Sequence, residues 1–248
     1  MRNYQEILTE DGSVTLYSRL YHEACHSLSG AINETIAHYV QGCELAKKAT
    51  KIPHLCVLEI GFGVGVGFIQ TKEELAKMNT KFTFISFEID EELIHIFAKK
   101  HQILFKKNDN VFSYKTNEFK LFIILGNARQ TIKQIPQITD LPVHAIFQDA
   151  FSPKRNSILW TTQWFEDLKR LAHKNCIMST YSASSSIRKS MISAGWKLYP
   201  GEQFGSKRSS TRARLTGSND ADIMDKLTRS PANELTDENY LEYKLGTK

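Results

Sequence analysis

A glycine-rich turn between an apolar strand and a helical pattern constrains the fold of this chain more than any other feature. The apolar run at residues 54–60 opens into four alternating glycines between residues 61 and 67, and a helical pattern continues to residue 78. Glycine tolerates positive φ angles and lets a ligand approach the backbone closely. A turn that only permits tight helix packing is the alternative. Because strand-to-helix turns of this kind bind nucleotides, the turn predicts a nucleotide-binding α/β fold.

The chain beyond this turn repeats the same alternation of apolar runs and helical patterns, which indicates βαβ units and a parallel sheet. Strands are predicted at residues 54–60, 82–87, 119–125, 143–148 and 176–180, with a final pair at 196–199 and 212–215. Helices are predicted at residues 66–78, 91–105, 128–134, 162–172 and 184–194. A parallel sheet that closes with a strand pair suits the nucleotide-binding α/β folds.

The first 50 residues differ in character and are expected to form an accessory layer over the sheet edge or the mouth of the site. An Asp-Gly pair at residues 11–12, between two short apolar runs, is a hairpin signal. A helix is predicted at residues 31–48, with Ser29 or Asn33 as its cap. This layer is expected to pack on a main domain formed by residues 51–215.

Charge is distributed unevenly along the 248 residues. The chain carries 32 Lys and Arg against 27 Asp and Glu, a net charge of +5. Residues 216–248 hold seven acids and four bases, so residues 1–215 carry 28 bases and 20 acids, a net of +8. A body this basic favours an anionic partner, and nucleic acid is the leading candidate. The polar, acidic tail is expected to be flexible or loosely docked.

Several classes of protein are disfavoured by the sequence. The 14 Phe, 9 Tyr and 3 Trp exclude disorder as the dominant state. The N-terminus lacks the basic and apolar stretches of a signal peptide, and no apolar run approaches the roughly 18 residues that span a bilayer. Cys25, Cys43, Cys56 and Cys176 form no C-x-x-C pair, so a thiolate metal site is not expected. We expect a cytoplasmic protein, monomeric, with no metal and no membrane contact.

Two cofactors compete for the glycine turn. The dinucleotide pattern G-x-G-x-x-G requires a third glycine where the chain has Val66. An acidic-x-G-x-G-x-G pattern fits without a gap, on Glu59, Gly61, Gly63 and Gly65. This form resembles the S-adenosylmethionine loop of Rossmann-like methyltransferases, in which Phe62 also belongs to the cofactor loop.

Further cofactor contacts are expected at the ends of the next two strands. Glu88 follows the strand at residues 82–87, where a carboxylate can accept hydrogen bonds from both ribose hydroxyls. Because NAD enzymes use an acid in the same place, Glu88 indicates adenosine in general. Asn127 and Ala128 follow the third strand, where a side chain can border the adenine. A plain helix cap is an equally open interpretation of Asn127.

Asp149 and a basic segment are the candidates for substrate binding. Asp149 follows the fourth strand, and ligands of open α/β sheets bind beyond the carboxyl ends of strands. A helix cap is the alternative for a lone aspartate at this point. Residues 204–214 mix Lys207, Arg208 and Arg212 with Gly, Ser and Thr, which suits contact with phosphates. A solvated basic hairpin is the alternative there.

Four landmarks together resemble the bacterial methyltransferase family that completes 5-methylaminomethyl-2-thiouridine in tRNA, the methyltransferase half of the MnmC-type enzymes. They are HSLSGAINET at residues 26–35, the glycine loop at 59–68 with Glu88 after it, QDAFSPKRN at 148–156 continuing to Trp160, and FGSKR at 204–208. Two residues depart from the family pattern. Asn127 stands where the family usually has aspartate, and Ser206 replaces a frequent arginine.

The resemblance implies a Rossmann-like fold and a tRNA N-methyltransferase that uses S-adenosylmethionine. The substrate would be the 5-aminomethyl group on the wobble uridine, thiolated or not, with Asp149 as the catalytic residue that holds the amine. Substrate or tRNA contacts would come from Phe151, Lys154, Tyr181, Lys207, Arg208 and Arg212. The FAD-dependent oxidase domain of the long family members is not expected here. A methyl or aminopropyl transferase acting on a polyamine, an NAD-dependent oxidoreductase and a non-catalytic RNA-binding module are the alternatives.

Overall fold

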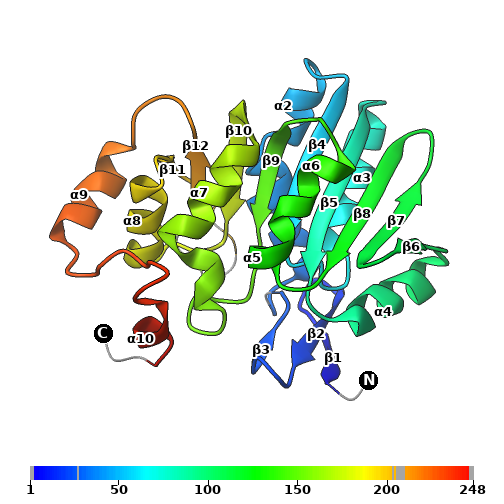
Figure 1. The fold of residues 1–248 in the computed structure, drawn as a ribbon, viewed down its shortest axis with the longest axis horizontal. Helices are drawn as coiled ribbons and strands as arrows, with labels where there is room; N and C mark the ends of the chain where they lie inside the picture. Colours follow the sequence, from blue (N-terminus) through cyan, green and yellow to red (C-terminus); the bar gives the residue numbers. More distant parts are fainter. Residues whose placement is uncertain (1–2, 27, 203, 205–209, 246–248) are drawn as a thin grey trace.

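The main feature of the fold is a nine-stranded sheet with helices on both faces (Figure 1). The computed structural model describes residues 3–26, 28–202, 204 and 210–245. The strands of this sheet are β4 (His54–Ile60), β5 (Lys81–Glu88), β6 (Lys106–Asn108), β7 (Val111–Lys115), β8 (Phe119–Leu125), β9 (Val143–Gln148), β10 (Ala172–Thr180), β11 (Lys197–Pro200) and β12 (Thr211–Arg214). They lie in the order β11-β12-β10-β9-β4-β5-β8-β7-β6.

The five central strands are parallel, as the sequence predicted. β8, β5, β4, β9 and β10 pair in parallel, whereas β12 runs antiparallel to both β10 and β11. A mostly parallel sheet of this order, closed by an antiparallel strand pair and flanked by helices, has the predicted Rossmann-like arrangement. Three of the predicted strands, β4, β8 and β9, have the bounds expected from the sequence.

Helices cover each face of the sheet because the central strands are apolar on both sides. Along β4, Leu55 and Val57 belong to one buried cluster, whereas Leu58 and Ile60 belong to the other. The first cluster is covered by α2 (Leu45–Ala49), α3 (Val66–Lys77), α4 (Glu91–His101) and a π-helix, η1 (Ile36–Gln41). The second is covered by α5 (Ala128–Thr131), η2 (Ile132–Gln134), α6 (Ile135–Ile138), η3 (Ser157–Trp160), α7 (Thr162–Leu171) and α8 (Ser185–Ser193).

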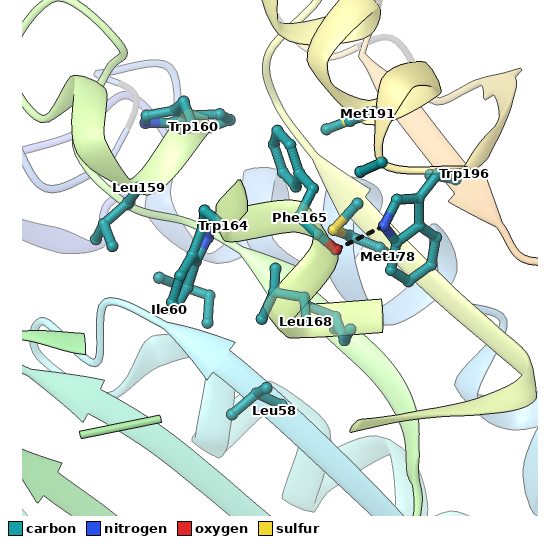
Figure 2. Close-up of a cluster of buried hydrophobic side chains, with 14 of the residues drawn as sticks. Leu58, Ile60, Leu159, Trp160, Trp164, Phe165, Leu168, Met178, Met191 and Trp196 are labelled. Carbon is teal, nitrogen blue, oxygen red and sulfur yellow. Dashed lines mark hydrogen bonds between the residues drawn. The ribbon is translucent and has the colours of Figure 1, made fainter. Parts of the chain in front are cut away.

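Tryptophans dominate the second cluster (Figure 2). Trp160, Trp164 and Trp196 are fully buried. The Trp196 indole donates to the carbonyl oxygen of Phe165 at 3.0 Å, so its one polar group is satisfied inside the core. This interaction ties the loop after α8 to α7.

The N-terminal layer forms a separate three-stranded sheet, β1 (Tyr4–Leu8), β2 (Val14–Ser18) and β3 (Glu23–Ala24), at the end of the main sheet where the parallel strands finish (Figure 1). The antiparallel pairing of β1 with β2 confirms the predicted hairpin. The single helix expected at residues 31–48 is wrong, because the chain forms α1 (Ala31–Thr35), η1 and α2. Gly30, and neither Ser29 nor Asn33, is the N-cap residue of α1, and the first backbone N–H groups of the helix donate to Ser13 Oγ and Asp11 Oδ2 of the hairpin.

A second correction concerns the segment after α4. The predicted helix at residues 91–105 ends at His101, since Gln102 adopts a left-handed conformation, and the chain then forms the β6–β7 hairpin. Asp109 has a positive φ of 51° in the turn of that hairpin. The short run at residues 108–110, Asn-Asp-Asn, was the missed signal, because Asn and Asp tolerate this conformation.

The acidic tail is docked, which corrects the expectation of a flexible or loosely docked segment. It contains α9 (Ala221–Arg229) and α10 (Tyr240–Leu245), which lie beyond α8 (Figure 1). Ile223 and Leu227, four residues apart on α9, are buried against the second cluster. Leu235 is 2% exposed, and its backbone N–H donates to Ser190 Oγ while its carbonyl accepts from the Thr162 N–H, both at 2.8 Å.

Truncation of Leu235 should measure how strongly the tail is docked. We expect Leu235→Ala to lower the free energy of unfolding by about 2–5 kcal/mol, because it opens a cavity in a packed site. Leu241→Ala on α10 is the matched control, since Leu241 is 56% exposed. Denaturant titration of both variants is the measurement. Equal stabilities would show that the tail does not contribute to the core.

Candidate active site

A cavity of about 370 Å³ opens at the carboxyl ends of the parallel strands. Its inner wall is formed by residues at or just beyond the carboxyl ends of β4, β5, β8 and β9, including Gly61, Glu88, Asn127 and Asp149. Its outer wall comes from the N-terminal layer, including Tyr21, Glu23, Cys25, His26, Leu28 and Glu34. The topology therefore brings together most of the strand-end residues that the sequence singled out.

The glycine loop needs its glycines for conformation and for space. Gly61, Gly63 and Gly65 have φ angles of 97°, 55° and 76°, in the left-handed region that side chains rarely adopt. A Cβ on Gly63 would meet no atom within 4 Å, so this residue presents bare backbone to the cavity. Such a loop, followed by the N-terminus of α3, is a cradle that a nucleoside-containing cofactor fits.

Glu88 holds the glycine loop from the neighbouring strand. Its carboxylate accepts hydrogen bonds from the backbone N–H groups of Gly63, Ile89 and Asp90 at 2.8, 2.8 and 2.9 Å. Burial raises the pKa of Glu88 to about 7, although the three backbone donors act in the opposite direction. A carboxylate at this place can accept from ribose hydroxyls, and its ionised form is the better acceptor.

Cofactor affinity should therefore depend on pH through Glu88. Binding favours the ionised carboxylate, so affinity rises as pH increases through about 7 and levels off above it. We expect the dissociation constant of S-adenosylmethionine to be about tenfold higher at pH 6 than at pH 8. Calorimetry across this range tests the expectation. The Glu88→Gln variant cannot ionise and should lose the dependence, whereas an unchanged pH profile in that variant would exclude Glu88 as its source.

Three predicted cofactor residues are not part of the cavity lining. Glu59, Phe62 and Gly65 are absent from the described lining of the cavity. Glu59 is buried and accepts from the Ser86 hydroxyl at 2.9 Å, and burial raises its pKa well above the usual range. Phe62 packs edge-on against Phe97. The Glu59 and Phe62 side chains thus pack against the protein, and direct cofactor contact by Glu59, Phe62 and Gly65 stays a prediction.

Asn127 and Ala128 do line the cavity, beside the strand end that carries Glu88. Asn127 Oδ1 accepts from the Arg129 backbone N–H at 3.0 Å and thereby caps α5. The capping role that the sequence left open is therefore present. Contact between Asn127 and the adenine of the cofactor stays a prediction.

Asp149 is positioned by its backbone and by a tyrosine that sequence reasoning missed. Its N–H donates to the Ile60 carbonyl at 3.2 Å, which fixes it beside the glycine loop. Tyr39 in η1 donates its hydroxyl to Asp149 Oδ1 at 2.5 Å. Tyr181 donates to the carbonyl oxygen of the next residue, Ala150, at 2.8 Å. The carboxylate is thus held at the floor of the cavity, not used as a helix cap.

The segment after Asp149 is clamped by the N-terminal layer. Phe151 stacks on Tyr21, with ring centroids 4.4 Å apart. Glu23 accepts a hydrogen bond from the Ser152 hydroxyl at 2.7 Å. Tyr21 and Glu23 were not identified from the sequence, because no local motif marks residues that act through a contact with a distant part of the chain.

The cavity is acidic. Glu23, Glu34, Glu88 and Asp149 line it, whereas none of its described lining residues is Lys or Arg. His26 also lines it, and burial lowers the pKa of this imidazole to about 4, so it is uncharged near neutral pH. A cavity with this balance of charges favours cationic ligands and disfavours anionic ones.

The basic residues predicted to contact tRNA differ in their surroundings. Lys154 is exposed on the segment that follows Phe151. Arg212 is engaged within the protein, since its Nε donates to the Pro200 carbonyl at 2.9 Å and its guanidinium lies 3.9 Å from Glu44. Lys207 and Arg208 lie outside the described residues.

Neither a metal cluster nor a membrane span is found in the part of the chain that the structure describes. No group of three or more His, Cys, Asp or Glu residues is placed to hold a metal ion there. No described helix is long and apolar enough to cross a bilayer. All four cysteines are free, and three of them are buried.

Comparison with known proteins identifies close counterparts of this architecture. Residues 90–216 match the model of a family described as S-adenosyl-L-methionine-dependent methyltransferases. The chain is similar to the tRNA 5-methylaminomethyl-2-thiouridine biosynthesis bifunctional proteins MnmC of Legionella pneumophila (24% identity over 77% of the chain and 34% of the relative) and Leptospira interrogans (27% over 82% and 34%). It thus spans about a third of the length of these curated relatives. The crystal structure of MNMC2 from Aquifex aeolicus matches with a TM-score of 0.82 and 28% identity, covering 98% of this chain and 85% of that one.

Proposed function

The chain belongs to the family of S-adenosyl-L-methionine-dependent methyltransferases, and from this premise we propose that it methylates the 5-aminomethyl group of the wobble uridine in tRNA, with or without the 2-thio group. The observation that carries the proposal is the acidic cavity around Asp149, which suits an acceptor that arrives as an ammonium ion. The names of the bifunctional relatives point to the same modification.

Asp149 has two tasks in this reaction. An alkylamine is protonated near neutral pH, and its lone pair is blocked until the proton leaves. The carboxylate accepts a hydrogen bond from the ammonium and orients its nitrogen toward the glycine loop, which reduces the entropy cost of an in-line transfer. Because a carboxylate with an ordinary pKa near 4 is a weak base, orientation is its main contribution, and the proton passes through it to water.

When bound, the cofactor would be held by the glycine loop and Glu88 and would supply a methyl group activated on a sulfonium. The acceptor nitrogen would gain this methyl group as the bond between methyl and sulfur breaks, and it would lose one proton by way of Asp149. Phe151, Tyr181 and Tyr21 line the same cavity as Asp149. Partial desolvation by these rings lowers the pKa of the bound amine and increases its reactive fraction.

Binding of tRNA is supported by the positive net charge of residues 1–215 and by its location outside the cavity. Residues 1–215 carry a net charge of +8, whereas the cavity itself is acidic. We assign phosphate contacts to the exposed Lys154 and to Lys207 and Arg208. Arg212 is assigned to holding the β11–β12 pair, given its contacts with Pro200 and Glu44.

The test is transfer of labelled methyl from S-adenosylmethionine to tRNA that lacks this modification, followed by nucleoside analysis. We expect the label in 5-methylaminomethyluridine, thiolated or not. A small amine such as a polyamine is the second candidate acceptor, since the acidic cavity also suits it. Labelling of spermidine but not of tRNA would replace the proposal with that alternative.

A further inference from the structure

Tyr39 of η1 contacts Asp149, but the proposed reaction assigns no role to this tyrosine. The two residues are 110 positions apart, and the 2.5 Å distance between the phenol oxygen and Oδ1 is that of a hydrogen bond to a charged acceptor. The Tyr39 ring is 2% exposed and packs on Phe147 of β9 at 5.3 Å. The hydroxyl therefore reaches Asp149 from inside the protein, and Tyr39 is not among the described residues that line the cavity.

The segment that carries Tyr39 is fixed on the sheet at both sides of the residue. Ser179 of β10 donates its hydroxyl to the His38 carbonyl, and the Cys43 thiol donates to the Ile177 carbonyl at 3.3 Å. Gly42 leaves no space for a side chain, since a Cβ would lie 2.0 Å from the His38 oxygen and 2.6 Å from Ser179 Oγ. π-Helical turns are frequent at functional sites, and these contacts hold the backbone on both sides of Tyr39 against β10.

Tyr39 is a permanent donor. Burial, together with the neighbouring charge of Asp149, raises the pKa of its hydroxyl well above the usual range, so the group stays protonated at working pH. A donor to the charged form of an acid favours that form and lowers the pKa of the acid. The bond also restricts the rotation of the carboxyl group.

We propose that Tyr39 is a positioning residue that keeps the Asp149 carboxylate ionised and oriented toward the acceptor amine. The inference rests on the proposed function and deepens it. Other titratable groups face Asp149 from each neighbouring element: Glu59 from β4, Tyr181 from the end of β10 and Cys25 from the N-terminal layer, while Glu34 and Glu88 line the same cavity. The negatively charged groups among them disfavour ionisation of the Asp149 carboxyl group. The hydrogen bond from the Tyr39 hydroxyl opposes this effect, because it stabilises the ionised carboxylate.

The test is Tyr39→Phe, which keeps the packed ring and removes only the hydroxyl. We expect kcat to fall by about tenfold to a hundredfold, while the dissociation constant of S-adenosylmethionine stays within about twofold. With S-adenosylmethionine saturating at every pH, so that Glu88 does not limit cofactor binding, the acid limb of the kcat/KM profile for the acceptor should move to higher pH by about one unit. Tyr4→Phe is the matched control, because Tyr4 is also buried and donates to another aspartate, Asp90, at 2.7 Å. It should leave the acid limb in place.

A second readout separates this inference from the proposed function. Titration of the Asp149 carboxyl carbon by NMR needs no acceptor, and the pKa of Asp149 should be higher in Tyr39→Phe than in the wild type. An unchanged pKa, or an unchanged rate in the variant, would overturn the role of Tyr39. If the wild type methylated no tRNA while the pKa still rose in the variant, the proposed function would fail and the coupling of Tyr39 to Asp149 would stand.

Discussion

Replacing Asp149 by alanine should lower the turnover number on tRNA about a thousandfold, the scale expected for loss of a group that positions and deprotonates a nucleophile. Cofactor binding should survive, because the backbone N–H of Asp149 donates to the Ile60 carbonyl beside the glycine loop, and the alanine variant keeps this backbone contact. Single-turnover methyl transfer measures the first effect, and calorimetry with S-adenosylmethionine measures the second.

Two further variants make the Asp149 result interpretable. Asp149→Asn keeps an oxygen that can accept from Tyr39 but removes the charge, so it should be nearly as inactive as alanine if the carboxylate must bind an ammonium ion. Asp140→Ala is the control, since Asp140 is exposed in the loop before β9. A folded Asp149→Ala variant that loses cofactor binding, but whose bound fraction still turns over normally, would contradict the assignment.

The parallel core was predictable because its signal is local. Buried parallel strands are apolar on both faces, and glycines or helix patterns bound them, so β4, β8 and β9 were predicted without error. The β6–β7 hairpin was missed because β6 is exposed, lysine-rich and only three residues long. Docking of the tail was not predicted, because its acidic composition was taken to indicate flexibility. The spacing of two apolar residues on α9, Ile223 and Leu227, was the better signal.

The site was predictable where topology alone fixes a residue. Glu88 and Asp149 end parallel strands, so any Rossmann-like arrangement places them at the same edge of the sheet. Tyr39 and Glu23 could not be found in this way. They belong to the N-terminal layer, and their contacts with the Asp149 segment depend on how that layer docks on the sheet. No periodic pattern or motif in one sequence encodes such a contact.

We expect the second large effect at Gly61, a residue of the cofactor loop whose backbone lies close to the backbone of Asp149. Gly61 has a φ of 97°, and a Cβ there would lie 2.9 Å from the carbonyl oxygen of Asp149. A side chain thus meets two penalties, a left-handed conformation that costs roughly 1–2 kcal/mol and a clash with backbone that cannot rotate away. The Gly61 N–H also donates to the Phe87 carbonyl at 3.2 Å, so a shift would be transmitted to the end of β5.

Gly61→Ala should therefore weaken S-adenosylmethionine binding by about ten- to a hundredfold, the range given by 1–3 kcal/mol, and lower turnover further because Asp149 is displaced. Gly12→Ala separates strain from contact, since Gly12 has a φ of 79° but a Cβ there would meet nothing within 4 Å. That control should lose stability by the conformational cost alone and bind the cofactor normally. Wild-type affinity in Gly61→Ala would show that the loop and Asp149 move independently, and would remove the physical link between cofactor binding and amine positioning on which the proposed chemistry depends.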